Sequence, residues 1–282
     1  MRRTGVSVLV LVFLFGFIAF AQSVYAGTMY ATDDITDNLY TINTTTGAAT
    51  LVGPTGQDLS LSGLAYDTAN STMYVSDVSL PTDGYGLGSV NLATGAVAII
   101  GSHVISNDIM GLAFIGNTLY GSDADNDSLD TINLATGAAT IVGPFVNQDS
   151  NGMKCLAYDS ETNTLYGMGN TNVYTIDPMT GTATLVGPLG VTFGNYVGCE
   201  VDSSTGILYA GDDPAGNLYS VNKTTGTATL VGPTGIQISG LAYVPSKATS
   251  VPTMNEWGMI IFLIAAGFGS VYYLRRLKIK EN

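Results

Sequence analysis

Residues 39–53, Leu-Tyr-Thr-Ile-Asn-Thr-Thr-Thr-Gly-Ala-Ala-Thr-Leu-Val-Gly, decide the fold of this 282-residue chain, because four related segments follow them. The Thr-Gly pair in each copy begins at residue 46, 94, 136, 180 or 225, so the copies are 48, 42, 44 and 45 residues apart. A period of this length is typical of propellers, solenoids and other repeat architectures. One structural unit is therefore expected to occur five times.

Each copy has the pattern of a β-hairpin. Residues 39–42 are aromatic, aliphatic or β-branched, as in a half-buried strand. Asn43 then favours a turn, because its side chain can accept hydrogen bonds from the backbone that follows. Gly47 adopts at little cost the positive φ that closes such a turn. The second strand runs over 48–52 and ends at Gly53-Pro54.

Two further strand-like segments precede each hairpin, at 61–67 and 72–77 in the second copy. Four strands in about 44 residues are the content of one β-propeller blade. We name these strands a to d in chain order and expect strand a to lie nearest the propeller axis. An open β-solenoid is the alternative, but its coils are usually shorter than this repeat.

The two ends of the repeat region complement each other. Residues 28–33 resemble a strand b with no strand a before it, and residues 238–243 resemble a strand a with no strand b after it. One blade would then be assembled from both ends, which removes free sheet edges. The sequence predicts an all-β, five-bladed β-propeller over residues 28–246, closed by pairing of its N-terminal and C-terminal strands.

The segment before the propeller has the features of a secretory signal peptide. Arg2 and Arg3 precede an apolar segment over 6–20, and small residues suit cleavage after Ala21 or Ala26. Residues 1–26 are therefore predicted to direct export from the cytoplasm. An uncleaved N-terminal anchor is the alternative.

The propeller segment is strongly acidic. Residues 28–246 hold 20 acidic residues and two basic ones, Lys154 and Lys223, so their formal charge is −18. Nucleic acid is excluded as a partner, because phosphate binding requires a basic surface. The acidity either keeps the protein soluble or provides a surface for cations and neutral polar ligands.

The segment after the propeller has three parts. A linker over 247–256 leads to an uncharged apolar segment over 257–274 and a basic tail over 275–282. Eighteen apolar residues suffice for a transmembrane helix, and basic residues after it favour the cytoplasmic side. The sequence therefore predicts a membrane anchor with the propeller outside the cytoplasm.

A short motif stands at the start of this apolar segment. Residues 251–258 read Val-Pro-Thr-Met-Asn-Glu-Trp-Gly, and the motif residues are Pro252, Thr253, Glu256, Trp257 and Gly258. With the apolar segment and basic tail, they resemble the IPTL-CTERM sorting signal of Gram-negative bacteria, a relative of the PEP-CTERM signals. The resemblance implies a bacterial protein sorted to the cell envelope by exosortase-type machinery. A plain C-terminal anchor would need the hydrophobicity alone.

The two cysteines, Cys155 and Cys199, fall on strands a of neighbouring repeats. Their registers differ by one residue, so they point to opposite faces of their own sheets. Opposite faces of adjacent blades meet, and exported proteins experience oxidising conditions, so a disulfide between two blades is predicted. Two buried free thiols are the alternative.

Lys154 and Glu200 compete with the cysteines for the same interface. Their registers also differ by one, and side-chain alternation lets only one of the two pairs face inwards. Glu200 stands where other repeats carry alanine. It therefore faces either a solvated channel or an interior that must supply a partner.

Aspartates are concentrated in the b–c loops, which alternation of the strands places on one rim together with the d–a connections. The residues predicted to form a ligand-binding rim are Asp33, Asp34, Asp37, Asp212 and Asp213. Asp123, Asp125 and Asp127 have a spacing at which alternate carboxylates can hold Ca²⁺, although Ser128 replaces the glycine of an EF-hand. Ordinary turn formation accounts for the same residues.

No catalytic constellation emerges from the sequence. His103, the only histidine, supports no catalytic triad and is expected to be an exposed loop residue. Glu161 and Glu200 are the only glutamates in 28–246, and no carboxyl pair stands out for glycoside hydrolysis. The prediction is a non-catalytic module that binds a carbohydrate, another polar ligand or an envelope protein. A carbohydrate-active enzyme using Glu200 with an aspartate, and a structural matrix protein, are the alternatives.

Overall fold

The structure is a computed structural model that describes residues 27–59, 62–82, 84–106, 108–146, 148, 152–195, 197–246 and 256–279. The predicted signal peptide over 1–26 lies outside these ranges, as do residues 247–255, which include Pro252 and Thr253 of the sorting motif. Residues 26–247 form one compact unit, and it contains the described strands.

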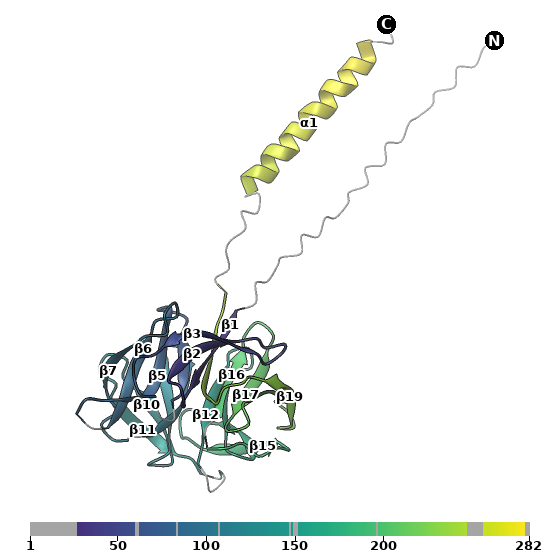
Figure 1. The fold of residues 1–282 in the computed structure, drawn as a ribbon. Helices are drawn as coiled ribbons and strands as arrows, with labels where there is room; N and C mark the ends of the chain where they lie inside the picture. Colours follow the sequence, from purple (N-terminus) through teal and green to yellow (C-terminus); the bar gives the residue numbers. More distant parts are fainter. Residues whose placement is uncertain are drawn as a thin grey trace, which may run out of the picture. The chain divides into compact units, whose positions relative to one another are not determined.

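The described strands form five four-stranded antiparallel sheets, which are the five blades that the sequence predicts (Figure 1). Four blades use consecutive strands, in the orders β4-β5-β6-β7, β8-β9-β10-β11, β12-β13-β14-β15 and β16-β17-β18-β19. The remaining blade has the order β20-β1-β2-β3. We number it blade 1 and the others blades 2 to 5 in chain order.

The first strand of each blade contacts the first strands of its neighbours and so surrounds the axis, as predicted for strand a. These inner strands are β20 (Ile238–Val244), β4 (Leu64–Asp67), β8 (Ile109–Ile115), β12 (Cys155–Asp159) and β16 (Val197–Asp202). The second strands are β1 (Thr28–Asp33), β5 (Thr72–Ser79), β9 (Thr118–Asp123), β13 (Thr164–Met168) and β17 (Ile207–Asp212). The third strands are β2 (Asn38–Ile42), β6 (Tyr85–Val90), β10 (Ser128–Ile132), β14 (Asn172–Ile176) and β18 (Asn217–Val221). The outer strands are β3 (Ala49–Pro54), β7 (Val97–Ser102), β11 (Ala139–Pro144), β15 (Ala183–Pro188) and β19 (Ala228–Pro233).

Strand β1 closes the ring. It pairs antiparallel with β2 on one side, where Tyr30 lies opposite Thr41, and with β20 on the other, where Tyr30 lies opposite Ala242. The predicted closure by the N-terminal and C-terminal strands is therefore confirmed. A strand paired on both edges offers no free edge to another chain.

The Thr-Gly pair that marks each repeat has a partner in the preceding blade. Gly143 on β11 lies so close to the hairpin of blade 4 that an added Cβ would overlap the Thr180 carbonyl oxygen. The same close approach recurs around the ring, for Gly53 with Thr94, Gly101 with Thr136, Gly187 with Thr225 and Gly232 with Thr46. The last pair joins blade 5 to blade 1. Each repeat therefore supplies the Thr-Gly hairpin for one blade contact and the strand-d glycine for the next.

The inner strands also approach one another through glycine. Gly63, Gly111, Gly198 and Gly240 share one repeat position, and a Cβ added to any of them would lie 2.6–2.7 Å from the main chain of the neighbouring inner strand. Cys155 occupies the fifth position. The axis at this level leaves no room for a water molecule. The backbone itself therefore closes the centre of the propeller.

Apolar side chains of the inner strands pack between neighbouring blades. Leu64 of blade 2 belongs to the same buried cluster as Ala242 of blade 1, and Leu156 of blade 4 to the same cluster as Ala113 of blade 3. Successive residues of one inner strand thus pack in the two opposite interfaces of its blade, as side-chain alternation requires. Each buried leucine stabilises the fold by roughly 1.5–3 kcal/mol.

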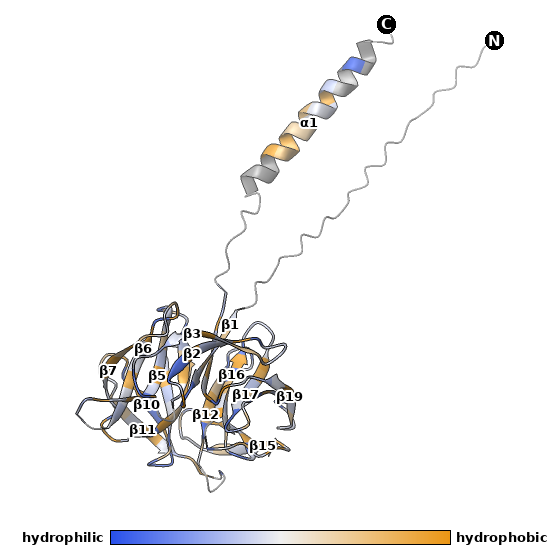
Figure 2. Cartoon of the chain, in the orientation of Figure 1, coloured by the Kyte–Doolittle hydropathy of each residue, from blue (hydrophilic) through white to orange (hydrophobic). Residues whose placement is uncertain are grey.

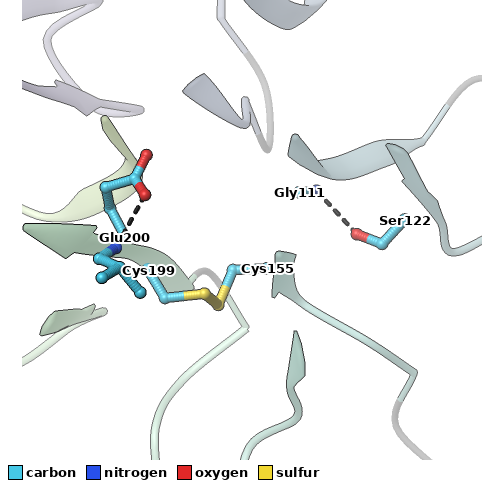
Figure 3. The surroundings of a disulfide bond; sticks show 6 residues. Gly111, Ser122, Cys155, Cys199 and Glu200 are labelled. Atoms are coloured by element: carbon cyan, nitrogen blue, oxygen red, sulfur yellow. Dashed lines mark hydrogen bonds between the residues drawn. A yellow bond between two sulfur atoms is a disulfide. The ribbon is translucent and has the colours of Figure 1, made fainter. Parts of the chain in front are cut away.

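A disulfide joins Cys155 to Cys199 across the interface of blades 4 and 5, with a Cα–Cα distance of 5.7 Å (Figure 3). The predicted pairing is confirmed. Lys154 and Glu200 do not pair with each other. The Lys154 Nζ atom donates to Met110 Sδ at 3.7 Å, and the Glu200 carboxyl group points away from the disulfide (Figure 3). Of the two pairs, only the cysteines therefore bridge the interface, as side-chain alternation predicts.

Outside the propeller the structure describes one helix, α1 (Glu256–Ile279). It begins at Glu256, Trp257 and Gly258 of the sorting motif, and its described part is largely hydrophobic (Figure 2). Its described apolar side chains, Ile261 and Phe268 among them, are exposed. Within the described residues, no helical segment combines the length and the hydropathy that crossing a bilayer requires. The membrane span over 257–274 stays a prediction.

Candidate functional site

A cavity of about 290 Å³ lies around the axis, at the end where strands a turn into strands b. All five blades contribute to its lining, through residues at or just after the ends of their inner strands. The closed part of the axis, at Gly63 and its equivalents, comes two or three residues earlier on the same strands. The cavity is therefore a pocket at one end of the ring. We call it the axial cavity.

Four blades place an aromatic side chain in the lining of the axial cavity at the same repeat position. These residues are Tyr66, Phe114, Tyr158 and Tyr243, and blade 5 has Val201 instead. The hydroxyl group of Tyr243 accepts a hydrogen bond from the Gly27 amide at 2.7 Å, which fixes its orientation. This set was not predicted from the sequence, because an aromatic residue on an inner strand also suits core packing. Its recurrence at the end of strand a was the available signal.

Glu200 is the acidic residue among the described lining residues. Its Oε1 atom accepts a hydrogen bond from the Val201 amide at 2.7 Å. Burial, with a smaller contribution from the nearby Asp202 carboxylate, raises the pKa of Glu200 to about 8, against the lowering effect of the Val201 and Tyr243 backbone. The sequence left two environments open for Glu200, a solvated channel or an interior that supplies a partner. The structure places its side chain in the axial cavity, where it is partly exposed yet poorly solvated.

The aspartate-rich rim lies at the opposite end of the axis. Asp37 Oδ1 accepts a hydrogen bond from the Leu59 amide at 2.8 Å, and Asp77 Oδ1 accepts one from the Ile109 amide at 3.0 Å. The first bond joins a b–c loop to a d–a connection, and the second joins the b–c end of β5 to the first residue of β8, so these two sets of segments share a rim as predicted.

The structure brings together several of the residues predicted to bind ligand on this rim. Burial raises the pKa of Asp34 to about 6, and the Asp213 carboxylate contributes to this shift. Burial also raises the pKa of Asp213 and Asp212. Asp33 is committed to a turn, where its side chain accepts hydrogen bonds from the residue 35 amide and the residue 36 hydroxyl at 3.0 Å each. Ligand binding at this rim stays a prediction.

The three aspartates with metal-ligand spacing have different environments. Asp123 is buried and accepts hydrogen bonds from Ser106 Oγ at 2.8 Å and from Asn126 Nδ2 at 2.7 Å. Asp125 and Asp127 are exposed. Across the residues that the structure describes, no group of three or more acidic, histidine or cysteine side chains is arranged to hold a metal ion. Calcium binding stays a prediction. Turn formation accounts for the Asn126 contact of Asp123, and the Ser106 contact ties this turn to the d–a connection.

The prediction that His103 is an exposed loop residue is wrong, because its side chain is fully buried. Its Nδ1 atom lies 3.0 Å from the Gly137 carbonyl oxygen, and its Nε2 atom lies 3.8 Å from Asp77 Oδ1. Burial lowers the pKa of His103. The physical reason is that the chain after β7 runs along the next blade, where the His103 carbonyl accepts a hydrogen bond from Ala139 at 3.0 Å.

The buried carboxyl groups should make the stability of the propeller depend on pH. Burial raises the pKa of Asp34, Asp108 and Asp130 to about 6 in each case. A carboxyl group whose pKa is higher in the folded state stabilises the fold below its unfolded pKa of about 4, and this contribution is lost as the pH rises through the folded value. We therefore expect the Tm to fall between pH 5 and pH 8, as measured by circular dichroism.

The matched variants for this prediction are Asp130→Asn and Asp177→Asn. Asp130 is fully buried, so Asp130→Asn should flatten the pH dependence. Asp177 is exposed in a turn where the other repeats carry asparagine, so Asp177→Asn should leave the dependence unchanged. A Tm that is constant or rises from pH 5 to pH 8 would contradict the expectation.

No family model matches the sequence, and no curated protein matches it. Among solved structures, a chain of the "Crystal structure of Nidogen/Laminin Complex" is similar, with a TM-score of 0.51 and 13% sequence identity. The match covers 77% of this chain and 97% of that chain. At this identity the similarity shows a shared β-propeller fold alone. The disulfide separately indicates a location outside the cytoplasm, because disulfides persist in oxidising compartments.

Proposed function

We propose that this protein is an exported, envelope-sorted β-propeller that binds a polar ligand or an envelope component without catalysing a reaction. The observation that carries the proposal is the axial cavity, with aromatic side chains from four blades and one carboxyl group. Concave sites that combine aromatic walls with a few placed polar groups are typical ligand pockets, and Thr68, Ser160 and Ser203 also line this one. Because every blade contributes, the site depends on the closed ring and on no single repeat.

The export and sorting part of the proposal rests on the disulfide and on the C-terminal segment. Disulfides form and persist in oxidising compartments, so the Cys155–Cys199 bond supports export. The exposed apolar side chains of α1 need a covering, which a bilayer or the exosortase-type sorting machinery would provide. In cells, fractionation of the full chain and of a variant lacking residues 251–282 tests this part. We expect the full chain with the envelope and the shortened chain in the soluble exported fraction.

The binding part is tested by spectral changes of the cavity tyrosines. Neutral oligosaccharides, small amines and envelope extracts should be titrated against the protein, with tyrosine fluorescence as the readout. A true ligand should lose about tenfold or more in affinity in Tyr158→Ala, because a stacked aromatic ring contributes roughly 1–2 kcal/mol. Tyr40→Ala is the control, since Tyr40 lies on β2, away from the axial cavity. Binding that is unchanged in Tyr158→Ala would reject the cavity as the site.

A carbohydrate-active enzyme is the second candidate, and the raised pKa of Glu200 is the observation that favours it. A carboxyl group with a pKa of about 8 stays protonated at neutral pH and is suited to general acid catalysis. Glycoside hydrolysis requires a second carboxyl group across the scissile bond, and Glu200 has no acidic companion among the described lining residues. Turnover of a polysaccharide that disappears in Glu200→Gln would establish the enzyme and reject the non-catalytic module.

A further inference from the structure

We propose that the axial cavity binds a small organic ammonium cation, held by the Glu200 carboxylate and the aromatic side chains around it. This inference rests on the proposed function and names the chemical class of the ligand. It follows from three observations: the contacts of Glu200, the placement of the basic residues and the nature of the cavity wall.

The contacts of Glu200 orient its carboxyl group but supply no cation to pair with its ionised form. The Val201 amide donates to Oε1 at 2.7 Å, and the backbone of Tyr243 donates a second hydrogen bond. No basic residue is present among the described residues that line the cavity. A poorly solvated carboxylate without a cation is costly. The cavity is therefore complementary to a ligand that supplies the positive charge.

The two lysines of the propeller are engaged outside the axial cavity. Lys223 Nζ lies 2.6 Å from Asp159 Oδ2, and Lys154 Nζ donates to Met110 Sδ at 3.7 Å. Residues 28–246 carry a formal charge of −18. A field of this sign raises the local concentration of cations and repels anions. Anionic ligands are thus disfavoured both by the cavity and by the whole propeller.

The wall suits an ammonium group that carries alkyl substituents. Tyr66, Phe114 and Tyr158 are only partly buried, so parts of their side chains are accessible at the cavity. Aromatic faces attract ammonium groups and also pack against their methyl or methylene carbons. A neutral sugar could stack on the same rings and donate hydroxyl hydrogen bonds to Glu200, but it could form no ion pair with the carboxylate. Dependence on that charge distinguishes the two ligand classes.

Cation binding should be linked to the ionisation of Glu200. The titratable groups near it are Asp202 on its own strand, Tyr243 on β20, and Tyr66 and Tyr158 elsewhere in the cavity lining. Asp202 opposes ionisation, as burial does, which gives Glu200 its pKa of about 8. A bound ammonium group favours the carboxylate and so lowers this pKa. Affinity should therefore rise as the pH increases through about 8, with release of a proton from Glu200.

Isothermal titration calorimetry of the full-length protein with choline tests the proposal. The matched probe is 3,3-dimethyl-1-butanol, which has the same shape but carries carbon in place of the charged nitrogen. We expect choline to bind at least about tenfold more tightly than this alcohol at pH 8.5. Choline affinity should increase from pH 6.5 to pH 8.5, and comparison of buffers with different ionisation enthalpies should show proton release.

Two glutamate variants complete the experiment. Glu200→Gln should remove both the preference for choline and its pH dependence, while Glu161→Gln, in an exposed turn, should leave both unchanged. Equal binding of choline and the alcohol, or a choline affinity that Glu200→Gln does not change, would overturn the ammonium proposal. Binding of neutral oligosaccharides that Tyr158→Ala weakens would then still support the proposed function. Failure of every probe to perturb the cavity tyrosines would reject both.

Discussion

Replacing Cys155 and Cys199 together by serine is expected to lower the free energy of unfolding of the propeller by about 3–4 kcal/mol. The disulfide joins residues 44 apart in sequence, so it restricts the unfolded chain, and the chain-entropy model gives this magnitude for a loop of that length. For a domain of this size the loss corresponds to a fall in Tm of about 6–16 °C. Urea unfolding followed by circular dichroism measures it.

Chemical reduction provides the control for the disulfide prediction. Dithiothreitol should lower the stability of the natural protein to nearly that of the double-serine variant, and it should have no effect on that variant. The cysteines lie in the interface of blades 4 and 5, so the core that contains Val197 and Tyr219 should lose protection against hydrogen exchange first. Equal unfolding midpoints for the natural protein and the double variant would contradict this account of the interface.

Gly143→Ala is expected to destabilise the propeller by about 3 kcal/mol, at the upper end of the usual cost of overpacking. The added methyl group would overlap the Thr180 carbonyl oxygen of the next blade. The methyl group would be attached directly to the main chain of β11, and the Thr180 oxygen belongs to the main chain of the next blade. The overlap can therefore be removed only if the two blades separate locally. Thermal and urea unfolding should both show the loss.

Gly235→Ala is the matched control for Gly143→Ala. Gly235 has a φ of 76°, but an added Cβ would meet nothing within 4 Å. Its substitution should therefore cost only the backbone strain of about 1 kcal/mol. If Gly143→Ala destabilises no more than Gly235→Ala, the contact between the Thr-Gly hairpin and the preceding blade is not what holds the blades together.

The number of blades and their closure could be predicted from the sequence, because both follow from counting. Five copies of the hairpin, an unpaired strand b at 28–33 and an unpaired strand a at 238–243 leave one arrangement that pairs every strand. The disulfide could be predicted from register together with the oxidising environment of an exported protein, because register alone also allowed Lys154 to face Glu200. The one-residue difference in register between Cys155 and Cys199 directs them to facing sides of adjacent blades.

The axial cavity could not be predicted in the same way. It depends on how five inner strands converge, and the glycines at the position of Gly63 look like ordinary strand residues until their distance from the neighbouring backbone is known. The environment of Glu200 depends on that convergence too. His103 was misjudged because a segment between two strands suggests exposure, whereas this one is held in the seam between two blades.

The central claim is that one ring of five blades is closed by β1 between β2 and β20, and that this closure completes the axial cavity. Cross-strand nuclear Overhauser effects between residues 28–33 and 238–244 test it most directly. The account predicts backbone contacts that place Tyr30 opposite Ala242 and Ala31 opposite Leu241. Absence of these contacts in the folded protein, or pairing of 238–244 with any strand other than β1, would contradict it.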